Sequence, residues 1–175
     1  MNYSNEANPT TISHPYVVEV EPEKYTLSQP VSTDEMYELL LSVIEQRFHR
    51  GDQLSSPGDT RIFFQLKLAR LEHEVFSVVF LDSQHRVLAY EEMFRGTIDS
   101  ASVYPREVVK QALKYNAAAV IFAHCHPSGI PEPSQADRSI TDKLVQALDL
   151  VGVRVLDHMI VAGIDCVSMA ERGLV

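Results

Sequence analysis

The sequence predicts one domain of mixed α/β class, on the basis of its length and of two kinds of hydrophobic pattern. At 175 residues the chain has the usual size of a single domain, and 45% hydrophobic residues suffice for an ordinary core. Two short apolar runs, Val75–Leu81 and Ala117–Ala123, are typical of buried strands. Apolar residues at helical spacing lie before, between and after these runs, which indicates helices joined to strands by both hairpins and crossovers.

The first 70 residues are expected to form a leader followed by two helices. The leader is polar and contains four prolines, which predicts an extended or disordered segment. Ser32–Glu35 has the pattern of a capping box, and the helix that follows it is expected to end near Arg50. Ser56 and Pro57 mark the start of a second helix. The divisions that we expect are 1–30, a flexible leader; 31–70, a helical N-terminal extension; and 71–175, the main domain.

The main domain is expected to begin with a hairpin and to continue with helices and strands. Asp82–His85 has the composition of a turn after the run Val75–Leu81. Pro105 is expected at the start of a helix, and Gly152 at the end of a later helix. The elements that we expect after the turn are a returning strand over Arg86–Arg95, a helix starting at Pro105, the strand Ala117–Ala123, a helix marked by Ile140, Leu144, Leu148 and Val151, and strands over Val153–Ala162 and Cys166–Met169.

Charge and composition argue against several classes of protein. The formal net charge is −9 and the pI is near 5.2, whereas a nucleic-acid-binding domain normally carries a basic patch for phosphate contacts, so direct nucleic-acid binding is disfavoured. No apolar run reaches the ~18–20 residues that cross a bilayer, and the N-terminus lacks the regions of a secretory signal. We therefore expect a cytoplasmic protein with two reduced cysteines and no membrane partner. The oligomeric state is left open.

The segment from His124 to Asp137 has a pattern that predicts a metal site. His124 and His126 are two residues apart at the end of an expected strand, so both imidazoles point from the same face and Cys125 points away. A loop of seven residues leads to Ser134, a good N-cap that places Asp137 in the first turn of the next helix. Two imidazoles and a carboxylate leave a fourth position for water, which is typical of a catalytic zinc site.

Each half of this pattern also has an ordinary structural interpretation. A histidine near a strand end is usually only a polar residue, and Ser-x-x-Asp before a helix is usually only a cap. The two halves together favour the metal site, because the loop between them has the length to close it.

The spacing of these residues resembles the metal motif of the JAB/MPN (JAMM) metalloprotease superfamily: His124-x-His126, seven residues, Ser134, two residues and Asp137. The stretch from about Leu71 to Leu174 is similar to the bacterial RadC-like branch, in phrases such as FRGTIDSASVYPREVVKQAL, NAAAVIFAHCHPSG and LDHMIV. The resemblance implies an α/β/α sandwich resembling the cytidine deaminase fold, with one zinc ion per chain.

The resemblance also implies a general base, for which Glu74 is the candidate. It lies immediately before Val75–Leu81, at the position where the family's glutamate stands. A carboxylate there would take a proton from zinc-activated water and deliver it to the leaving amine. Three other glutamates are rivals, since a single glutamate is more often a surface charge. Glu72 lies near a helix end, and Glu91 and Glu92 are expected to be solvated or structural.

Three further residues have two interpretations each. Ser134 resembles the family serine that helps to stabilise the tetrahedral oxyanion, and it is also a helix cap; the two roles are compatible. Cys125 stands where the branch commonly has Asn, and we expect a small buried residue, since a thiol turned inward would fill the open metal position. His158 is expected to be a core histidine, with support of the metal ligands from behind as the alternative.

The expected function is that of a zinc-dependent metallopeptidase, which cleaves a peptide or isopeptide bond in a protein or peptide substrate. The alternative is a non-catalytic accessory or scaffold protein of RadC type, associated with DNA repair or a mobile element. A nucleobase deaminase is disfavoured, because its His-x-Glu and Pro-Cys-x-x-Cys signatures are absent. Residues 1–70 also lack the Gly-rich hairpin signature of the helix-hairpin-helix segment in full-length RadC proteins. Substrate and biological process are not identified by the sequence.

Overall fold

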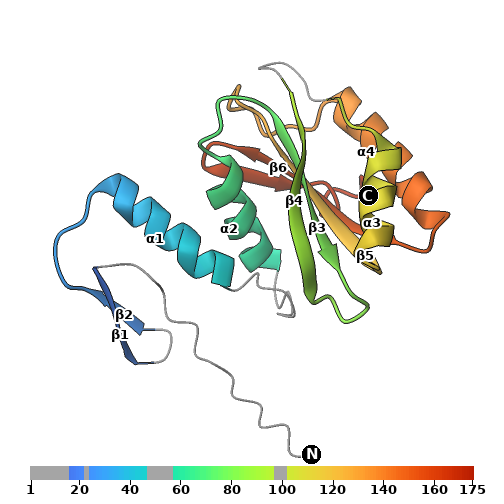
Figure 1. The fold of residues 1–175 in the computed structure, drawn as a ribbon. Helices are drawn as coiled ribbons and strands as arrows, with labels where there is room; N and C mark the ends of the chain where they lie inside the picture. The colour runs from blue at the N-terminus through green and yellow to red at the C-terminus, as the bar shows by residue number, and fades with distance from the viewer. Residues whose placement is uncertain (1–15, 22–23, 47–56, 97–101) are drawn as a thin grey trace, which may run out of the picture.

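The computed structural model describes residues 16–21, 24–46, 57–96 and 102–175, which form four helices and two sheets (Figure 1). The main sheet has the strand order β4-β3-β5-β6-β7. Its neighbouring strands are antiparallel except β5 and β6, which are parallel and are connected through α4. The elements in chain order are β1 (Val17–Glu21), β2 (Lys24–Leu27), α1 (Thr33–Gln46), α2 (Pro57–Leu68), β3 (Val75–Leu81), β4 (Val87–Arg95), α3 (Pro105–Lys114), β5 (Ala119–Cys125), α4 (Gln135–Asp149), β6 (Arg154–Ala162) and β7 (Asp165–Ser168).

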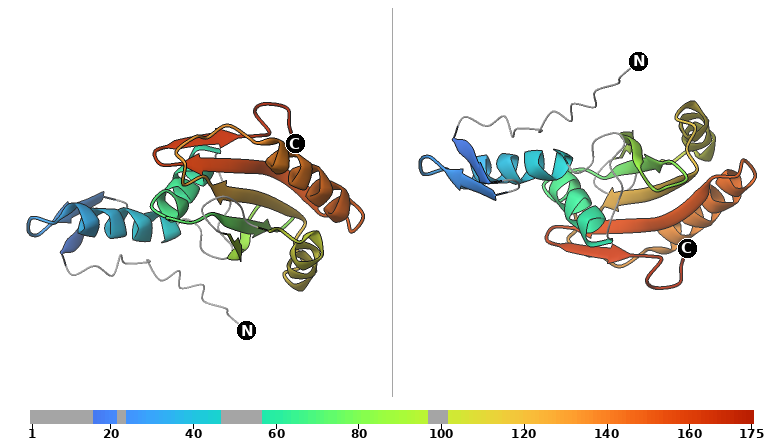
Figure 2. Two further views of the ribbon diagram at one scale, coloured as in Figure 1. Left: turned by 90° about the horizontal axis from the view of Figure 1, so that it is seen from above. Right: turned by 90° about the horizontal axis from the view of Figure 1, so that it is seen from below.

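Helices cover both faces of the main sheet, so the α/β/α sandwich that the resemblance implies is confirmed (Figure 2). On one face Phe64 and Leu68 of α2 are buried in a cluster with alternate residues of β3 and β5. On the other face Val108 of α3 and Leu144 of α4 are buried in a second cluster. Each such side chain contributes roughly 1.5–3 kcal/mol by burial, and the two clusters together hold the three layers in contact.

Strand alternation sends neighbouring residues of β3 and β5 to opposite faces. All residues of β3 are buried, as the unbroken apolar run predicts. Val75 belongs to the cluster under α2, whereas Phe76 belongs to the cluster under α3 and α4. The register pairs Phe76 with His124 across β3 and β5. His124 therefore points toward the face that α4 covers, and Cys125 lies on the α2 face.

The N-terminal part contains a hairpin that the sequence did not reveal. Residues 1–30 are predicted to be a flexible leader, but β1 and β2 pair within this segment as a two-stranded antiparallel sheet. The predicted capping box of α1 is confirmed, because the Ser32 hydroxyl accepts from Glu35 N at 3.2 Å and the Glu35 carboxylate accepts from Ser32 N at 2.7 Å. The predicted helix end near Arg50 lies outside the described residues. Helix α1 and the hairpin project from the sandwich (Figure 2).

The predicted second helix is also confirmed, starting at Pro57, but its place in the fold differs from the expectation. The sequence groups it with the N-terminal extension, whereas α2 is one layer of the sandwich. The division at residue 71 stays a prediction. Among the described residues, no helix combines the length and the apolar character that crossing a bilayer requires.

The C-terminal turn is tied to three other parts of the sandwich. The Asp157 carboxylate of β6 accepts from the Ser168 hydroxyl at 2.6 Å and from Ala170 N at 3.0 Å. Arg61 of α2 donates to Glu171 at 2.9 and 3.0 Å. Arg172 pairs with Glu132 in the loop before α4. These contacts hold the turn beside the loop that connects the predicted metal ligands.

Candidate metal centre

The three predicted metal ligands come from the end of β5 and the start of α4. His124 is the last residue but one of β5, His126 comes directly after the strand, and Asp137 is the third residue of α4. Ser134 is the N-cap of α4, as predicted, and forms a capping box with Asp137. Such a cap stabilises a helix start by about 1 kcal/mol, and here it also fixes the position of the carboxylate.

The side chains of these residues converge on one point. The Nε2 atoms of His124 and His126 are 2.8 Å apart. The Asp137 carboxylate lies 3.1 Å from His124 Nε2 and 3.5 Å from His126 Nε2. His124 is 1% and Asp137 8% exposed, while His126 is more open to solvent. The structure thus brings together the three predicted ligands at a position that solvent reaches from one side.

The hydrogen bond of His126 Nδ1 determines whether Nε2, the nitrogen that faces the centre, carries a proton or a lone pair. His126 Nδ1 lies 2.7 Å from the carbonyl oxygen of Ile130, which only accepts hydrogen bonds. Neutral His126 therefore carries its proton on Nδ1 and leaves Nε2 bare. A bare nitrogen beside a second imidazole nitrogen and a carboxylate could hold a metal ion, and two nitrogens with one oxygen fit a divalent transition metal.

The electrostatics of the centre favour an ionised carboxylate. Burial opposes ionisation of Asp137, but hydrogen bonds from His124 and His126 outweigh it and hold the pKa of this carboxyl well below its usual range. The same hydrogen bond to Asp137 raises the pKa of His126 above its ordinary value, against the opposing effect of burial. Without a metal, a proton held between these groups would take the place of the cation.

Ser134 interacts with Asp137 through three hydrogen bonds. Asp137 Oδ2 accepts from the Ser134 hydroxyl at 2.6 Å and from Ser134 N at 2.7 Å. Asp137 N donates back to the Ser134 hydroxyl oxygen at 3.1 Å. The hydroxyl proton is thus directed at the carboxylate, and the oxyanion role of Ser134 stays a prediction that requires the hydroxyl to turn toward a substrate.

Glu74 lies one residue before β3. The pairing of β3 with β5 ends at Phe76 and His124, and strand alternation counted back from Phe76 directs Glu74 to the ligand face. Its carbonyl oxygen accepts from Gly96 N at 2.8 Å, which holds the backbone in the line of the strand. The negative charge of Glu74 adds to the effect of Asp137 in raising the pKa of His126. The electrostatic effect on His126 is in keeping with the prediction of Glu74 as general base, and both its exact position beside the ligands and its catalytic role stay predictions.

The rival glutamates are held elsewhere. Glu92 pairs in register with Ser77, on the α2 side of the sheet, and forms an ion pair with Arg95 at 3.0 Å. Glu91 accepts a hydrogen bond from the Tyr115 hydroxyl. Glu72 is exposed in the segment between α2 and β3. Of the four glutamates, Glu74 is the one whose charge acts on the pKa of His126.

Cys125 points away from the ligands, as strand alternation predicts. Its thiol accepts from Val75 N and donates to the His73 carbonyl oxygen, both at 3.4 Å. Burial raises the pKa of this thiol, which makes it a poor ligand. The fourth position of the centre is therefore not filled by Cys125.

His158 stands directly behind His124 and is fully buried. Its Nε2 lies 2.8 Å from His124 Nδ1, and its Nδ1 lies 2.6 Å from the Thr141 hydroxyl of α4. Burial lowers the pKa of His158, so its imidazole is neutral. The two interpretations of His158 therefore coincide, since a satisfied core histidine also contacts a ligand. Sequence reasoning missed Thr141, although its place four residues after Asp137 puts both on one helix face.

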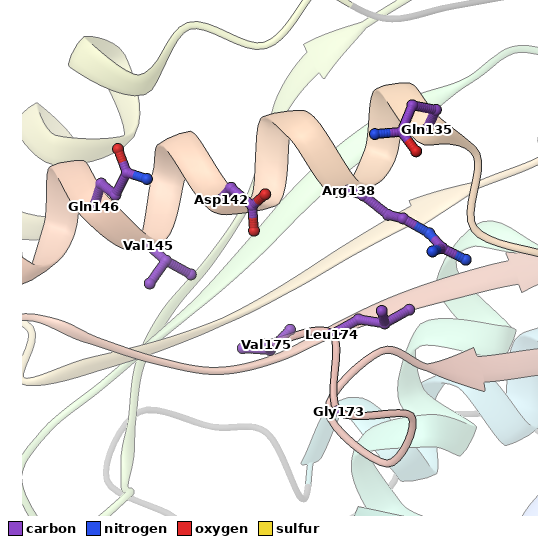
Figure 3. A pocket seen from close by; sticks show the side chains of 8 residues that line it. All are labelled: Gln135, Arg138, Asp142, Val145, Gln146, Gly173, Leu174 and Val175. Carbon is purple, nitrogen blue, oxygen red and sulfur yellow. The ribbon is translucent and has the colours of Figure 1, made fainter.

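A hollow of about 520 Å³ lies between α4 and the C-terminal residues, apart from the metal ligands (Figure 3). Its charged side chains are Arg138 and Asp142, on a different face of α4 from Asp137. It contains none of the three ligands, and we assign it no role in the chemistry of the centre.

Comparison with known proteins accords with this geometry. The family described as "RadC-like JAB domain" matches residues 54–174, a range that includes α2. A UPF0758 protein of Vibrio cholerae serotype O1 is 55% identical over 150 residues, which cover 86% of this chain and 94% of that protein. A UPF0758 protein of Marinobacter nauticus is 58% identical over 137 residues, 78% of this chain, and one of Cellvibrio japonicus is 62% identical over 123 residues, 70% of this chain.

Coverage of these relatives differs. The chain spans 61% of the Marinobacter nauticus protein and 55% of the Cellvibrio japonicus protein, so those two are longer than the region they share with it. The family match covers well over half of the chain, and the resemblance drawn from the metal motif is confirmed. The chain belongs to the RadC-like JAB domain family.

Proposed function

We propose that this protein is a zinc-dependent metallopeptidase of the JAMM type, which cleaves a peptide or isopeptide bond in a protein or peptide substrate in the cytoplasm. The observation that carries the proposal is the convergence of His124, His126 and Asp137, with Glu74 on the same face. Three protein ligands with an open fourth position are typical of catalytic rather than structural zinc.

The donor set supports zinc as the metal. Two imidazole nitrogens and one carboxylate oxygen suit zinc, whereas magnesium and calcium prefer sites built of oxygen alone. His124, His126 and Asp137 would hold the ion. The chemistry that zinc supplies when bound is a water of pKa lowered toward ~7 and a Lewis acid for the scissile carbonyl.

The remaining steps fall to residues of the chain. Glu74 is the candidate to accept a proton on its carboxylate and to return it to the leaving amine, which requires a group that is ionised at neutral pH. Ser134 orients Asp137 through its hydroxyl and its backbone N–H. In addition, the Ser134 hydroxyl could donate to the developing oxyanion after turning from Asp137, a contribution of a few kcal/mol in comparable sites.

Metal content and turnover of matched variants test this proposal. Mass spectrometry of the purified protein is expected to find about one zinc per chain, and none in His126→Ala. A screen with peptide and isopeptide substrates would then compare Glu74→Gln with Glu92→Gln, a glutamate on the opposite face. We expect Glu74→Gln to keep its zinc and lose roughly 100-fold or more in rate, and Glu92→Gln to retain both.

Two outcomes would overturn the proposal in different ways. Normal hydrolysis by Glu74→Gln would remove the assignment of the base and leave the metal centre intact. Wild-type protein that holds no zinc after purification without chelators and after reloading would remove the enzyme altogether. The non-catalytic accessory or scaffold protein would then be the better interpretation.

A further inference from the structure

A buried chain of hydrogen bonds connects the two elements that supply the metal ligands. It runs from His124 on β5 to His158 on β6, from there to Thr141 on α4, and ends at the Asp137 carbonyl oxygen. Its three side chains are each at most 1% exposed. Because buried polar groups need partners, the direction of every bond in such a chain is constrained by its ends.

The end at Asp137 sets the direction. The Thr141 hydroxyl has one proton, and it lies 2.6 Å from a carbonyl oxygen that only accepts. The Met169 sulfur, 3.8 Å away, is a weaker acceptor and more distant. Donation to His158 Nδ1 instead would leave two oxygen acceptors 2.6 Å apart with no proton between them, which is repulsive. The proton of Thr141 is therefore donated to the Asp137 carbonyl, and the hydroxyl oxygen is left to accept from His158.

The direction then passes through both imidazoles. His158 carries its proton on Nδ1, which donates to Thr141 at 2.6 Å, so its Nε2 is bare and accepts from His124 Nδ1 at 2.8 Å. With its proton on Nδ1, neutral His124 presents a bare Nε2 toward His126 and Asp137. The tautomer of His124 thus depends on Thr141, whose hydroxyl bonds to the backbone carbonyl oxygen of Asp137 and not to its carboxylate.

The side chains around His158 hold its imidazole ring in one orientation. Phe76 and Phe122 pack edge-on against its ring, with centroids 5.4 and 5.8 Å away. These walls are apolar and hold the plane of the ring, so that its two nitrogens reach only His124 and Thr141 among the described side chains. A ring fixed in this way cannot turn to offer a different nitrogen without losing both bonds.

We propose that Thr141 and His158 are positioning residues, which hold His124 as the Nδ1–H tautomer and couple its orientation to the first turn of α4. The inference rests on the proposed metal centre, since its consequence is the affinity of that centre for a divalent cation. Partners behind metal-bound histidines typically change metal affinity by roughly 10–100-fold when they are removed.

The hydroxyl of Thr141 can be removed with little change of shape, which gives the principal test. Thr141→Val leaves His158 Nδ1 without its acceptor, and Thr141→Ser restores the hydroxyl. Ser77→Ala is the matched control, because Ser77 is also fully buried in the sheet but donates to the Ala123 carbonyl on the α2 side. In chelator competition we expect Thr141→Val to bind zinc roughly 10–100-fold more weakly, and Thr141→Ser and Ser77→Ala to stay close to wild type.

A second readout does not depend on metal affinity. Long-range proton–nitrogen correlation spectra of the whole protein, labelled with nitrogen-15 in histidine, distinguish an Nδ1–H from an Nε2–H imidazole. We expect His158 to be the Nδ1–H tautomer in wild type and Thr141→Ser, with or without zinc. Thr141→Val is expected to lose this preference, and if that variant fails to fold, the wild-type and Thr141→Ser spectra still decide the question.

The outcomes separate this inference from the proposed function. An Nε2–H His158 in wild type, or an unchanged zinc affinity in folded Thr141→Val, would overturn the positioning role. Tight zinc binding with the expected tautomers but without hydrolysis of any peptide or isopeptide would sustain the positioning role and remove the peptidase. A wild-type protein that binds neither zinc nor cobalt would remove both.

Discussion

The two faces of the main sheet are formed by the same strands but differ in the kind of side chain that they bury. Under α2 the buried side chains are chiefly apolar, and the Cys125 thiol there forms its hydrogen bonds with the backbone atoms of Val75 and His73. Under α4 the buried residues include His124, His158 and Thr141, which are bonded to one another. One step along β5, from His124 to Cys125, separates a predicted metal ligand from a core residue.

This difference follows from the period of a strand. Successive side chains point to opposite faces, so a change at one position of β5 affects one face and leaves the other largely intact. The polar chain under α4 depends on direction and distance, whereas the cluster under α2 depends on volume. Substitutions on the two faces should therefore have separable effects, with metal binding lost on one and stability on the other.

The largest effect is expected for Asp137→Ala. The substitution removes the anionic ligand and leaves His124 and His126 facing one another at 2.8 Å, so we expect the protein to lose its zinc entirely and all turnover with it. Asp142→Ala is the matched control, an exposed aspartate on the same helix. Zinc content by mass spectrometry is the measurement, and a full complement of zinc in Asp137→Ala would disprove its role as a ligand.

A large loss of stability is expected for Phe64→Ala on the opposite face. Phe64 is 0% exposed within the cluster under α2, and truncation of a buried phenylalanine typically costs about 3–5 kcal/mol. Ile62→Ala, on the exposed side of the same helix, should stay within about 0.5 kcal/mol of wild type. Urea unfolding measures both. The folded Phe64→Ala protein is expected to retain zinc. Loss of zinc from this variant would show that the two faces of the sheet are coupled.

The cysteines provide a smaller and purely chemical contrast. Burial raises the pKa of Cys166 to about 11 and raises that of Cys125, so neither thiol should react with iodoacetamide in the native protein at pH 7.5. Both should react in urea, and Cys125→Ala should keep its zinc. Loss of zinc from Cys125→Ala would mean that the thiol turns toward the metal.

The same register argues against a disulfide between the two cysteines. Cys125 pairs with Val161 and Val161 pairs with Cys166, so the two cysteines lie two strands apart. That separation is ~9–10 Å, beyond the reach of a disulfide. The thiols are therefore expected to stay reduced even under oxidising conditions, which thiol titration after exposure to air would check.

The sequence predicted the strands well, and it predicted the residues that converge at the candidate metal centre, because their signals are local. The run Val75–Leu81 is a strand from its first to its last residue, and Ser134 caps α4 as its spacing indicates. The β5 strand extends to Cys125 rather than ending at Ala123, because His124 and Cys125 each find a buried environment on their own face.

What the sequence missed depends on contacts between distant segments. Among the described strands, β1 and β2 pair only with each other, and Val18 and Val20 of β1 are exposed, so these valines do not mark a buried face. Ile130 contacts His126 through its backbone carbonyl oxygen, and the identity of a side chain does not predict such a contact. Thr141 is an ordinary helix residue until β6 brings His158 against it.

The smallest expected effects come from two serines that cap helices in the same way. Ser32 and Ser134 each form a capping box, but the partner of Ser32 is Glu35 at the exposed start of α1, whereas the partner of Ser134 is the predicted metal ligand Asp137. Removing either cap by substitution to alanine is expected to cost about 1 kcal/mol in the stability of its helix start.

Zinc affinity then separates the two caps. Ser32→Ala should leave it unchanged, while Ser134→Ala should weaken it, since Asp137 loses the hydroxyl that donates to Oδ2 at 2.6 Å. Stability and zinc affinity measured on the same samples distinguish a cap from a positioning group. If turnover in Ser134→Ala fell much further than zinc occupancy does, the excess would be the contribution of the hydroxyl to the oxyanion. If turnover and occupancy fell together, Ser134 would act through Asp137 alone.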